Sequence, residues 1–311
     1  MSDIILHHYA GSPFSEKVRM VLGYKALAWK SVTVPVVLPK PDVVALTGGY
    51  RRTPFLQIGA DIYCDTALMC RVIDKVAPAP PLYPVAAGGV QHMLAQWADM
   101  ALFWSAVPYT LQPAGVPHVF AGAPAEFPRI FGADRAAMTA GMRRPTTADA
   151  HAQLLTYLAW LEQLLDDGRK FLCCDAASIA DFGVAQSLWF IRLAPPVATV
   201  LAPFPRLGSW FERVQAFGHG THEEMSSEEA LAISASARAT APTRFDKEQG
   251  FAPGDAVMVT PTDYAMDPVA GRLCGLTLDE VAIERHDDRA GRVVVHFPRI
   301  GFQIKRDKTK E

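Results

Sequence analysis

The sequence lacks the features that mark membrane, secreted and nucleic-acid-binding proteins. No run of apolar residues approaches the roughly 18 that a membrane-spanning helix needs, and the first residues hold no basic segment of the kind that opens a signal peptide. The 30 Lys and Arg residues are balanced by 32 Asp and Glu residues, which gives a formal net charge of −2. This balance argues against a nucleic-acid partner, which usually requires a basic excess. We therefore expect a globular cytoplasmic protein that does not enter membranes.

Cysteine is scarce and poorly spaced for structural bonding. The five cysteines include no Cys-x-x-Cys pair, and two of them, Cys173 and Cys174, are adjacent. An odd number without paired spacing argues against a disulfide framework or a structural zinc site. The nine histidines are scattered, and none has metal-ligand spacing with an acid or a cysteine. We therefore expect no metal cofactor.

The 311 residues leave room for two domains and a small third one. The clearest boundary is the stretch 78–84, where four prolines predict a stiff linker. Before it, residues 1–80 show hydrophobic patterns that predict the order βαβ and then ββα, an α/β domain. After it, apolar residues at helical spacing predict an all-helical domain over 81–217, with a long loop at 113–133.

The composition and patterning of the sequence change after residue 217. Residues 218–250 are polar and predict a linker that carries one helix at 223–238. Residues 251–311 contain short β-branched runs separated by turn signals, which predict a small all-β domain. The predicted fold is therefore an α/β domain, then an all-helical domain, then a small β domain.

Three short motifs in the first domain are candidates for ligand binding. Ser12, followed by proline, lies between a predicted strand and a predicted helix, where it caps the helix and where free N–H groups favour an anion such as a thiolate. The pair Thr53-Pro54 precedes a predicted hairpin, and a cis bond there would expose the backbone of Thr53 to a ligand. Asp65-Thr66 begins another predicted helix, where its carboxylate, hydroxyl and N–H groups suit an amino-acid zwitterion. Each motif also has a plain structural interpretation, as a helix cap or a trans proline at a sheet edge.

In this order and spacing, the motifs resemble the thioredoxin-like domain of the cytosolic glutathione transferases. The string RTPFLQIGADIYCDTALM resembles that family throughout. The resemblance implies that the Ser12 hydroxyl stabilises the glutathione thiolate and that Thr53-Pro54 pairs with the cysteinyl backbone. It further implies that Asp65-Thr66 binds the γ-glutamyl end.

Two of these assignments leave alternatives open. Tyr9 and Ser15 lie near Ser12 in the sequence, and we rank Ser12 first, Tyr9 second and Ser15 third as the group that activates the thiol. Lys40, in the loop after the second predicted strand, is placed to meet the glycyl carboxylate of glutathione, and the alternative is a solvated loop charge.

The helical domain carries a family motif of its own. Ser178 and Asp181 have the Ser-x-x-Asp spacing of a capping box at the start of a buried helix, so we assign Asp181 to folding rather than catalysis. The resemblance thus covers about residues 1–217. It places an apolar electrophile between the two domains, with Phe120 and Phe127 from the long loop as a lid. The residues expected to line this pocket are Trp97, Met100, Phe103 and Trp104. The alternative is that these residues, which follow helical spacing, belong to the ordinary hydrophobic core.

The resemblance implies a cytoplasmic, homodimeric enzyme of the detoxification type, which joins the glutathione thiolate to a hydrophobic electrophile. The alternative is a non-catalytic scaffold that binds another protein through its C-terminal β domain. Arg51 and Arg52 depart from the family, which usually has one basic residue before the proline, and either arginine would bind a carboxylate or serve the dimer interface. We recognise no motif in residues 218–311.

Overall fold

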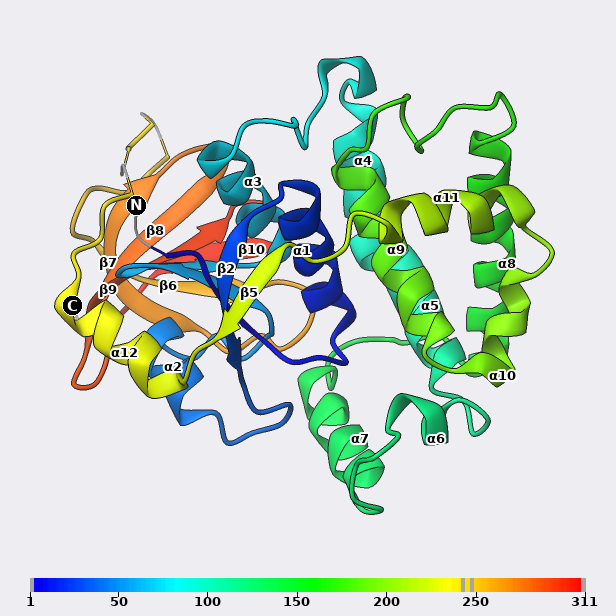
Figure 1. Cartoon of the computed structure of the whole chain (residues 1–311). Helices are drawn as coiled ribbons and strands as arrows, with labels where there is room; N and C mark the ends of the chain where they lie inside the picture. Colours follow the sequence, from blue (N-terminus) through cyan, green and yellow to red (C-terminus); the bar gives the residue numbers. More distant parts are fainter. Residues whose placement is uncertain (1–2, 242–243, 247–248, 309–311) are drawn as a thin grey trace.

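The computed structural model describes residues 3–241, 244–246 and 249–308, and it shows a sheet-based half beside a helical half (Figure 1). The first part of the chain has the predicted order, with one additional short helix before the hairpin. Helix α1 begins at the predicted place because Ser12 is its N-cap and proline, whose fixed φ suits the first helical turn, follows it. The elements are β1 (Ile5–His8), α1 (Pro13–Tyr24), β2 (Ala28–Thr33), α2 (Pro41–Thr47), β3 (Phe55–Ile58), β4 (Asp61–Cys64) and α3 (Thr66–Val76).

The helical half lies on the right of Figure 1 and is built around the buried helix α9. The predicted capping box at its start is present, and the carboxylate of Asp181 accepts a hydrogen bond from the Ser178 N–H at 2.8 Å. The same carboxylate accepts from the Trp210 indole at 2.8 Å, so one buried acid ties two helices together. The elements are η1 (Val85–Ala87), α4 (Val90–Trp97), the π-helical turn η2 (Ala98–Leu102), α5 (Phe103–Thr110), α6 (Val116–Val119), α7 (Phe127–Met138), α8 (Thr147–Leu164), α9 (Ile179–Arg192), α10 (Pro195–Ala198), η3 (Thr199–Leu201) and α11 (Pro205–Gln215).

The residues after 217 return to the sheet-based half. The segment predicted as a linker also forms a strand, β5, which was not predicted and which pairs in parallel with β2. The helix predicted at 223–238 is present as α12, which buries Ala230 and Leu231 against the sheet. The predicted β region follows. The elements are β5 (Thr221–Glu224), α12 (Ser227–Ser236), β6 (Ala256–Pro261), β7 (Val269–Leu276), β8 (Glu280–Asp287), β9 (Gly291–Pro298) and β10 (Phe302–Arg306).

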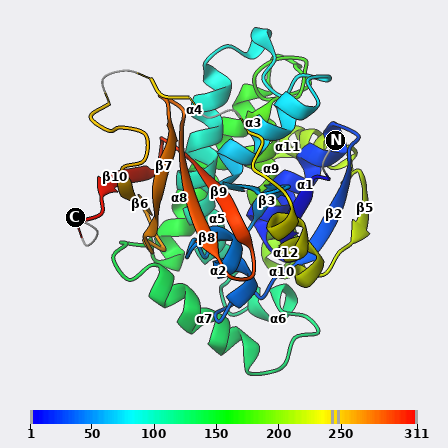
Figure 2. The ribbon, with the colours of Figure 1, turned by 90° about the vertical axis from the view of Figure 1, so that its left-hand side faces the viewer.

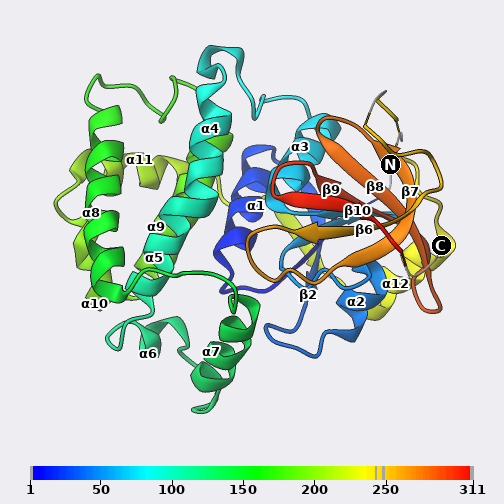
Figure 3. The ribbon, with the colours of Figure 1, turned by 180° about the vertical axis from the view of Figure 1, so that it is seen from behind.

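All the described strands belong to one sheet of ten strands, in the order β10-β6-β7-β8-β9-β4-β3-β1-β2-β5. Figure 2 shows this sheet from its side, with β6, β7 and β10 at one end and β2 and β5 at the other. The join is the parallel pairing of β9 with β4, the last strand of the N-terminal hairpin. Ile62 of β4 and Val295 of β9 share one buried core. The C-terminal strands therefore extend the N-terminal sheet, and Figure 3 shows them beside α3.

A buried histidine holds this join together. His296 on β9 is fully buried and lies between two carboxylates, with Nε2 3.0 Å from Asp61 of β4 and Nδ1 2.6 Å from Glu280 of β8. Burial by itself lowers the pKa of an imidazole, but the two carboxylates outweigh it and raise the pKa of His296 above its ordinary 6.5. The Tyr63 ring stacks on the imidazole, with the two ring centroids 4.6 Å apart. A charged histidine thus links three neighbouring strands.

None of the helices in the described part of the chain is both long enough and apolar enough to cross a membrane.

The His296 contacts predict how stability depends on pH. Replacing His296 with Gln should lower the free energy of unfolding by about 3–5 kcal/mol near pH 6, because it leaves buried carboxylates without their cation. The folded-state pKa of His296 lies above 6.5, so its charge stabilises the fold fully below that pH and is lost as the pH rises through the folded value. Urea unfolding of both proteins from pH 6 to 9 should show the difference shrinking, and a difference that stays constant would contradict this account.

Candidate active site

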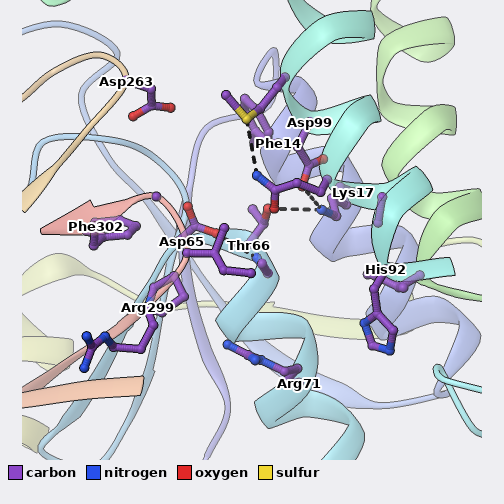
Figure 4. A pocket seen from close by; sticks show the side chains of 18 of the residues that line it. Phe14, Lys17, Asp65, Thr66, Arg71, His92, Asp99, Asp263, Arg299 and Phe302 are labelled. Atoms are coloured by element: carbon purple, nitrogen blue, oxygen red, sulfur yellow. Dashed lines mark hydrogen bonds and ion pairs between the residues drawn. The ribbon is translucent and has the colours of Figure 1, made fainter. Parts of the chain in front are cut away.

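A cavity of about 630 Å³ opens where three parts of the molecule meet. Figure 4 shows the start of α3 with Asp65 and Thr66 near its centre, the α4–η2 rod on one side, and Asp263 and Phe302 of the C-terminal region on the other. The volume lies within the range of small-molecule sites. The cavity therefore has walls from both predicted domains and from the C-terminal region.

Four of the predicted glutathione-binding residues line this cavity, namely Thr53, Pro54, Asp65 and Thr66. The Thr53–Pro54 peptide bond is cis. Neither the main-chain N–H nor the C=O of Thr53 is bonded to another described residue, so both are free for a ligand. Asp65 caps α3, and its carboxylate accepts from the Ala67 N–H at 2.9 Å.

Lys17 is a site residue that the sequence does not reveal. It lies on α1 and lines the cavity, although only 1% of its side chain is exposed, and its Nζ is 2.5 Å from Asp99 and 3.3 Å from the Thr66 hydroxyl. Gln186 donates to the other oxygen of Asp99 at 2.7 Å. Burial lowers the pKa of an ammonium, but Asp99 outweighs this and raises the pKa of Lys17, which stays charged. The helical pattern gives Lys17 an ordinary polar position, and it becomes buried because α1 packs against α9 and α3 and because Asp99 of η2 pairs with its ammonium.

Ser12 is not among the lining residues of the cavity, although Phe14, two residues further along the chain, is. Ser12 is 2% exposed, and its hydroxyl oxygen accepts from the Ser15 N–H at 3.2 Å, which leaves the hydroxyl proton free to be donated. Arg19 holds the loop before α1 by donating to the carbonyl of Ala10 at 3.0 Å. Ser15, the third candidate, is fully buried.

Lys40, the fifth predicted glutathione-binding residue, does not line the cavity but contacts Thr53, which does. Its Nζ donates to the Thr53 hydroxyl at 3.1 Å and to the Arg51 carbonyl at 3.4 Å, and the residue is only 5% exposed. Burial, with the guanidinium of Arg135 nearby, lowers the pKa of Lys40 to about 8. Lys40 is therefore a buried cation beside Thr53 rather than a solvated loop charge.

Helix α7 lies over the loops near Lys40. Arg51 pairs with Asp134 of α7 at 2.5 Å, and Arg135 donates to the Tyr9 hydroxyl at 3.3 Å. The hydroxyl of Tyr9, the second candidate, accepts this bond and, like that of Ser12, keeps its own proton free to be donated. The predicted lid residues, Phe120 and Phe127, pack with each other at 5.8 Å and are not lining residues of the cavity.

The predicted electrophile residues divide into two pairs. Trp97 and Met100 line the cavity, whereas Phe103 and Trp104 are not among its lining residues and lie behind it. Phe103 packs against Phe14 of α1, with ring centroids 4.6 Å apart.

The C-terminal region contributes cavity residues that no sequence motif predicts. Arg52, adjacent to Thr53, donates to the carboxylate of Asp263 and to the carbonyl of Tyr264, and its guanidinium lies 3.8 Å from the centre of the Tyr264 ring. Asp263 and Tyr264, on the loop between β6 and β7, line the cavity. Each of the two unusual arginines thus binds a carboxylate of its own chain.

The described residues contain no group of three or more His, Cys, Asp or Glu side chains placed to hold a metal ion.

Comparison with known proteins places this geometry in a family. Residues 6–81 match a model described as "Glutathione S-transferase, N-terminal domain", and residues 143–213 match the C-terminal domain model. A solved GST-like protein from Pseudomonas syringae is 39% identical, with a TM-score of 0.82, and the match covers 99% of this chain and 100% of that chain. The match therefore includes the C-terminal region. This chain belongs to the glutathione S-transferase family.

Other solved structures share the fold at lower identity. A glutathione S-transferase from Rhodospirillum rubrum is 21% identical over 68% of this chain and 88% of that chain, with a TM-score of 0.53. A tau class glutathione S-transferase from mango, Mangifera indica, is 16% identical over 69% of this chain and 89% of that chain, with a TM-score of 0.51. A search of curated proteins gives no match.

The contact between Arg52 and the β6–β7 loop predicts a local change in stability. Replacing Asp263 with Ala should speed amide hydrogen exchange in residues 262–266 about 5- to 30-fold, because Arg52 loses its charged partner while the sheet stays intact. The matched control is Asp255→Ala, which breaks a comparable pair with Arg306 elsewhere in the same region, at 2.8 Å. Equal exchange in residues 262–266 of the two variants would show that the Arg52 contact does not hold the loop.

Proposed function

We propose that the protein binds glutathione in this cavity and transfers its thiolate to a hydrophobic electrophile. The observation that carries the proposal is the convergence of Thr53, Asp65, Thr66 and Lys17 on one cavity that also has an aromatic wall. The family membership of the chain supports a glutathione site. A non-catalytic scaffold has no observation in its favour among the described residues, whereas four residues of the predicted glutathione site line one cavity.

The cavity, together with Lys40 beside Thr53, offers a partner for each part of glutathione. The γ-glutamyl amine suits the carboxylate of Asp65, and the α-carboxylate suits the Thr66 hydroxyl and the ammonium of Lys17, which is 3.3 Å from that hydroxyl. The free main-chain groups of Thr53 can pair with the cysteinyl unit as a strand does. Lys40, beyond Thr53, is placed for the glycyl carboxylate.

This orientation directs the cysteinyl sulfur toward the start of α1. There the positive end of the helix and the Ser12 hydroxyl both favour a thiolate over a thiol. The thiolate attacks the electrophilic carbon, a carbon–sulfur bond forms, and the bond to the leaving group breaks with its electron pair. The proton released earlier from the thiol passes to solvent. The direct test is binding to immobilised glutathione together with turnover of a generic aromatic halide, and the absence of both would overturn the proposal.

Ser12 should be needed for the rate rather than for binding. Ser12→Ala removes one hydrogen bond to a charged sulfur, so kcat/KM should fall about 10- to 100-fold, and the pKa of bound glutathione should rise by about one to two units. The measurement is the pH dependence of kcat/KM with 1-chloro-2,4-dinitrobenzene, with the glutathione Kd unchanged. Tyr9→Phe is the comparison, since it tests the second candidate. A loss with Tyr9→Phe and none with Ser12→Ala would reassign the role to Tyr9.

Lys40 predicts a pH dependence of binding. The pKa of Lys40 is lowered to about 8, so its charge is present below pH 8 and lost above it. S-methylglutathione, whose sulfur cannot ionise, should bind wild type about 10- to 100-fold more tightly than Lys40→Met near pH 6.5. Calorimetric titration should show this ratio falling toward one as the pH rises past 8. A ratio that stays constant with pH would mean that Lys40 does not hold the carboxylate.

We also propose the homodimer and the cytoplasmic location that the family implies. Sedimentation equilibrium measures the first directly, because a dimer has twice the mass of the 33.9 kDa chain.

A further inference from the structure

Aromatic side chains form a continuous series beside the cavity, and we call this series the aromatic collar. Its members are in contact pairwise, with ring centroids 4.6 Å apart for Phe14 and Phe103, 5.1 Å for Phe103 and Trp104, and 5.3 Å for Trp104 and Tyr264. Arg52 closes the series by lying over the Tyr264 ring at 3.8 Å. The collar thus consists of Phe14, Phe103, Trp104 and Tyr264, from α1, α5 and the β6–β7 loop.

The collar ends beside the two backbone segments that, in the proposed glutathione site, would hold the reacting sulfur. Phe14 lies two residues after Ser12, and Arg52 immediately precedes Thr53. Phe14 and Tyr264 are the two members that line the cavity, while the other two lie behind them. An electrophile in contact with a sulfur held between these segments therefore lies against Phe14 and Tyr264.

Tyr264 is fixed in place by bonds on both sides of its loop. Asp263 and the Tyr264 carbonyl are bound by Arg52, and the next residue, Ala265, donates its N–H to the carbonyl of Met138 at the end of α7, at 2.7 Å. The Tyr264 hydroxyl has no hydrogen-bond partner among the described residues. The loop that carries the ring is thus held by two parts of the chain far from it in the sequence.

We propose that Tyr264 of the C-terminal region is a specificity-determining residue, which selects planar aromatic electrophiles. Flat rings pack against other rings in offset or edge-on arrangements that bulky tetrahedral groups cannot adopt. Phe14 and Tyr264 both line the cavity and offer such contacts to a flat ring. The conjugation step rests on the proposed function, whereas the binding of the aromatic ring does not.

The first measurement compares two electrophiles with the same glutathione site. For 1-chloro-2,4-dinitrobenzene, the thiolate bonds to the ring carbon and chloride leaves with the electron pair; for iodoethane, it bonds to the CH₂ carbon and iodide leaves. Tyr264→Leu should lower kcat/KM for the aromatic substrate about tenfold, and should leave that for iodoethane and the KM for glutathione within about twofold. Tyr264→Phe, which keeps the ring, should match wild type.

The second measurement needs neither glutathione nor turnover. Calorimetric titration with 1,3-dinitrobenzene, which has no leaving group, should give a Kd about tenfold weaker for Tyr264→Leu than for wild type. The control is Phe251→Leu. Phe251 also belongs to the C-terminal region and also has an arginine over its ring, since Arg306 lies 5.3 Å from the ring centre. Unlike Tyr264, however, Phe251 is not a lining residue of the cavity. This control should bind like wild type.

The outcomes separate this proposal from the proposed function. If wild type binds 1,3-dinitrobenzene and Tyr264→Leu binds it more weakly, the assignment of Tyr264 stands, even if no glutathione turnover is found. The assignment is overturned if both substrates lose rate equally in Tyr264→Leu, if Phe251→Leu loses as much as Tyr264→Leu, or if wild type does not bind the aromatic probe.

Discussion

The arrangement of the active site depends on the pairing of β9 with the outer edge of β4. A strand edge is a row of free N–H and C=O groups that must be paired or protected, and here the chain pairs its own edge in register from Asp61 with Val294 to Tyr63 with His296. His296, between Asp61 and Glu280, ties three strands at this point. Because β9 is fixed, the β6–β7 and β9–β10 loops lie over the start of α3. The match to the family's domain models ends at residue 213, and the C-terminal region of this chain adds a third wall to the cavity.

Three ion pairs then join the N-terminal α/β part of the chain to its surroundings. Lys17 pairs with Asp99 of η2, Arg51 pairs with Asp134 of α7, and Arg52 pairs with Asp263 of the β6–β7 loop. Buried pairs of this kind contribute little net stability, because desolvation offsets their attraction, but breaking one of them is costly. Their effect here is to specify which surfaces meet, so that the α4 and η2 helices and the C-terminal region are aligned on the same cavity, while α7 is held against the segment that precedes Thr53.

The sequence predicted the parts of the molecule that depend on local signals. The order of elements before residue 80, the capping box of Ser178 and Asp181, and the place where α1 begins follow from patterning and caps, and all three are present. The places of Thr53, Asp65 and Thr66 follow from motif spacing. The continuation of one sheet through β9 could not be predicted, because parallel pairing between residues more than 200 positions apart has no local signature. For the same reason Lys17 and Tyr264 were missed, since each becomes a cavity residue only through contacts with distant segments.

The most direct test of the account is a crystal structure of the protein bound to S-methylglutathione. The account predicts that the γ-glutamyl group lies at Asp65 and Thr66, that the cysteinyl main chain pairs with Thr53, and that the glycyl carboxylate meets Lys40. The methylated sulfur should then lie between the start of α1 and the Tyr264 ring. A tripeptide bound in the reverse direction, or at another place on the molecule, would contradict the account.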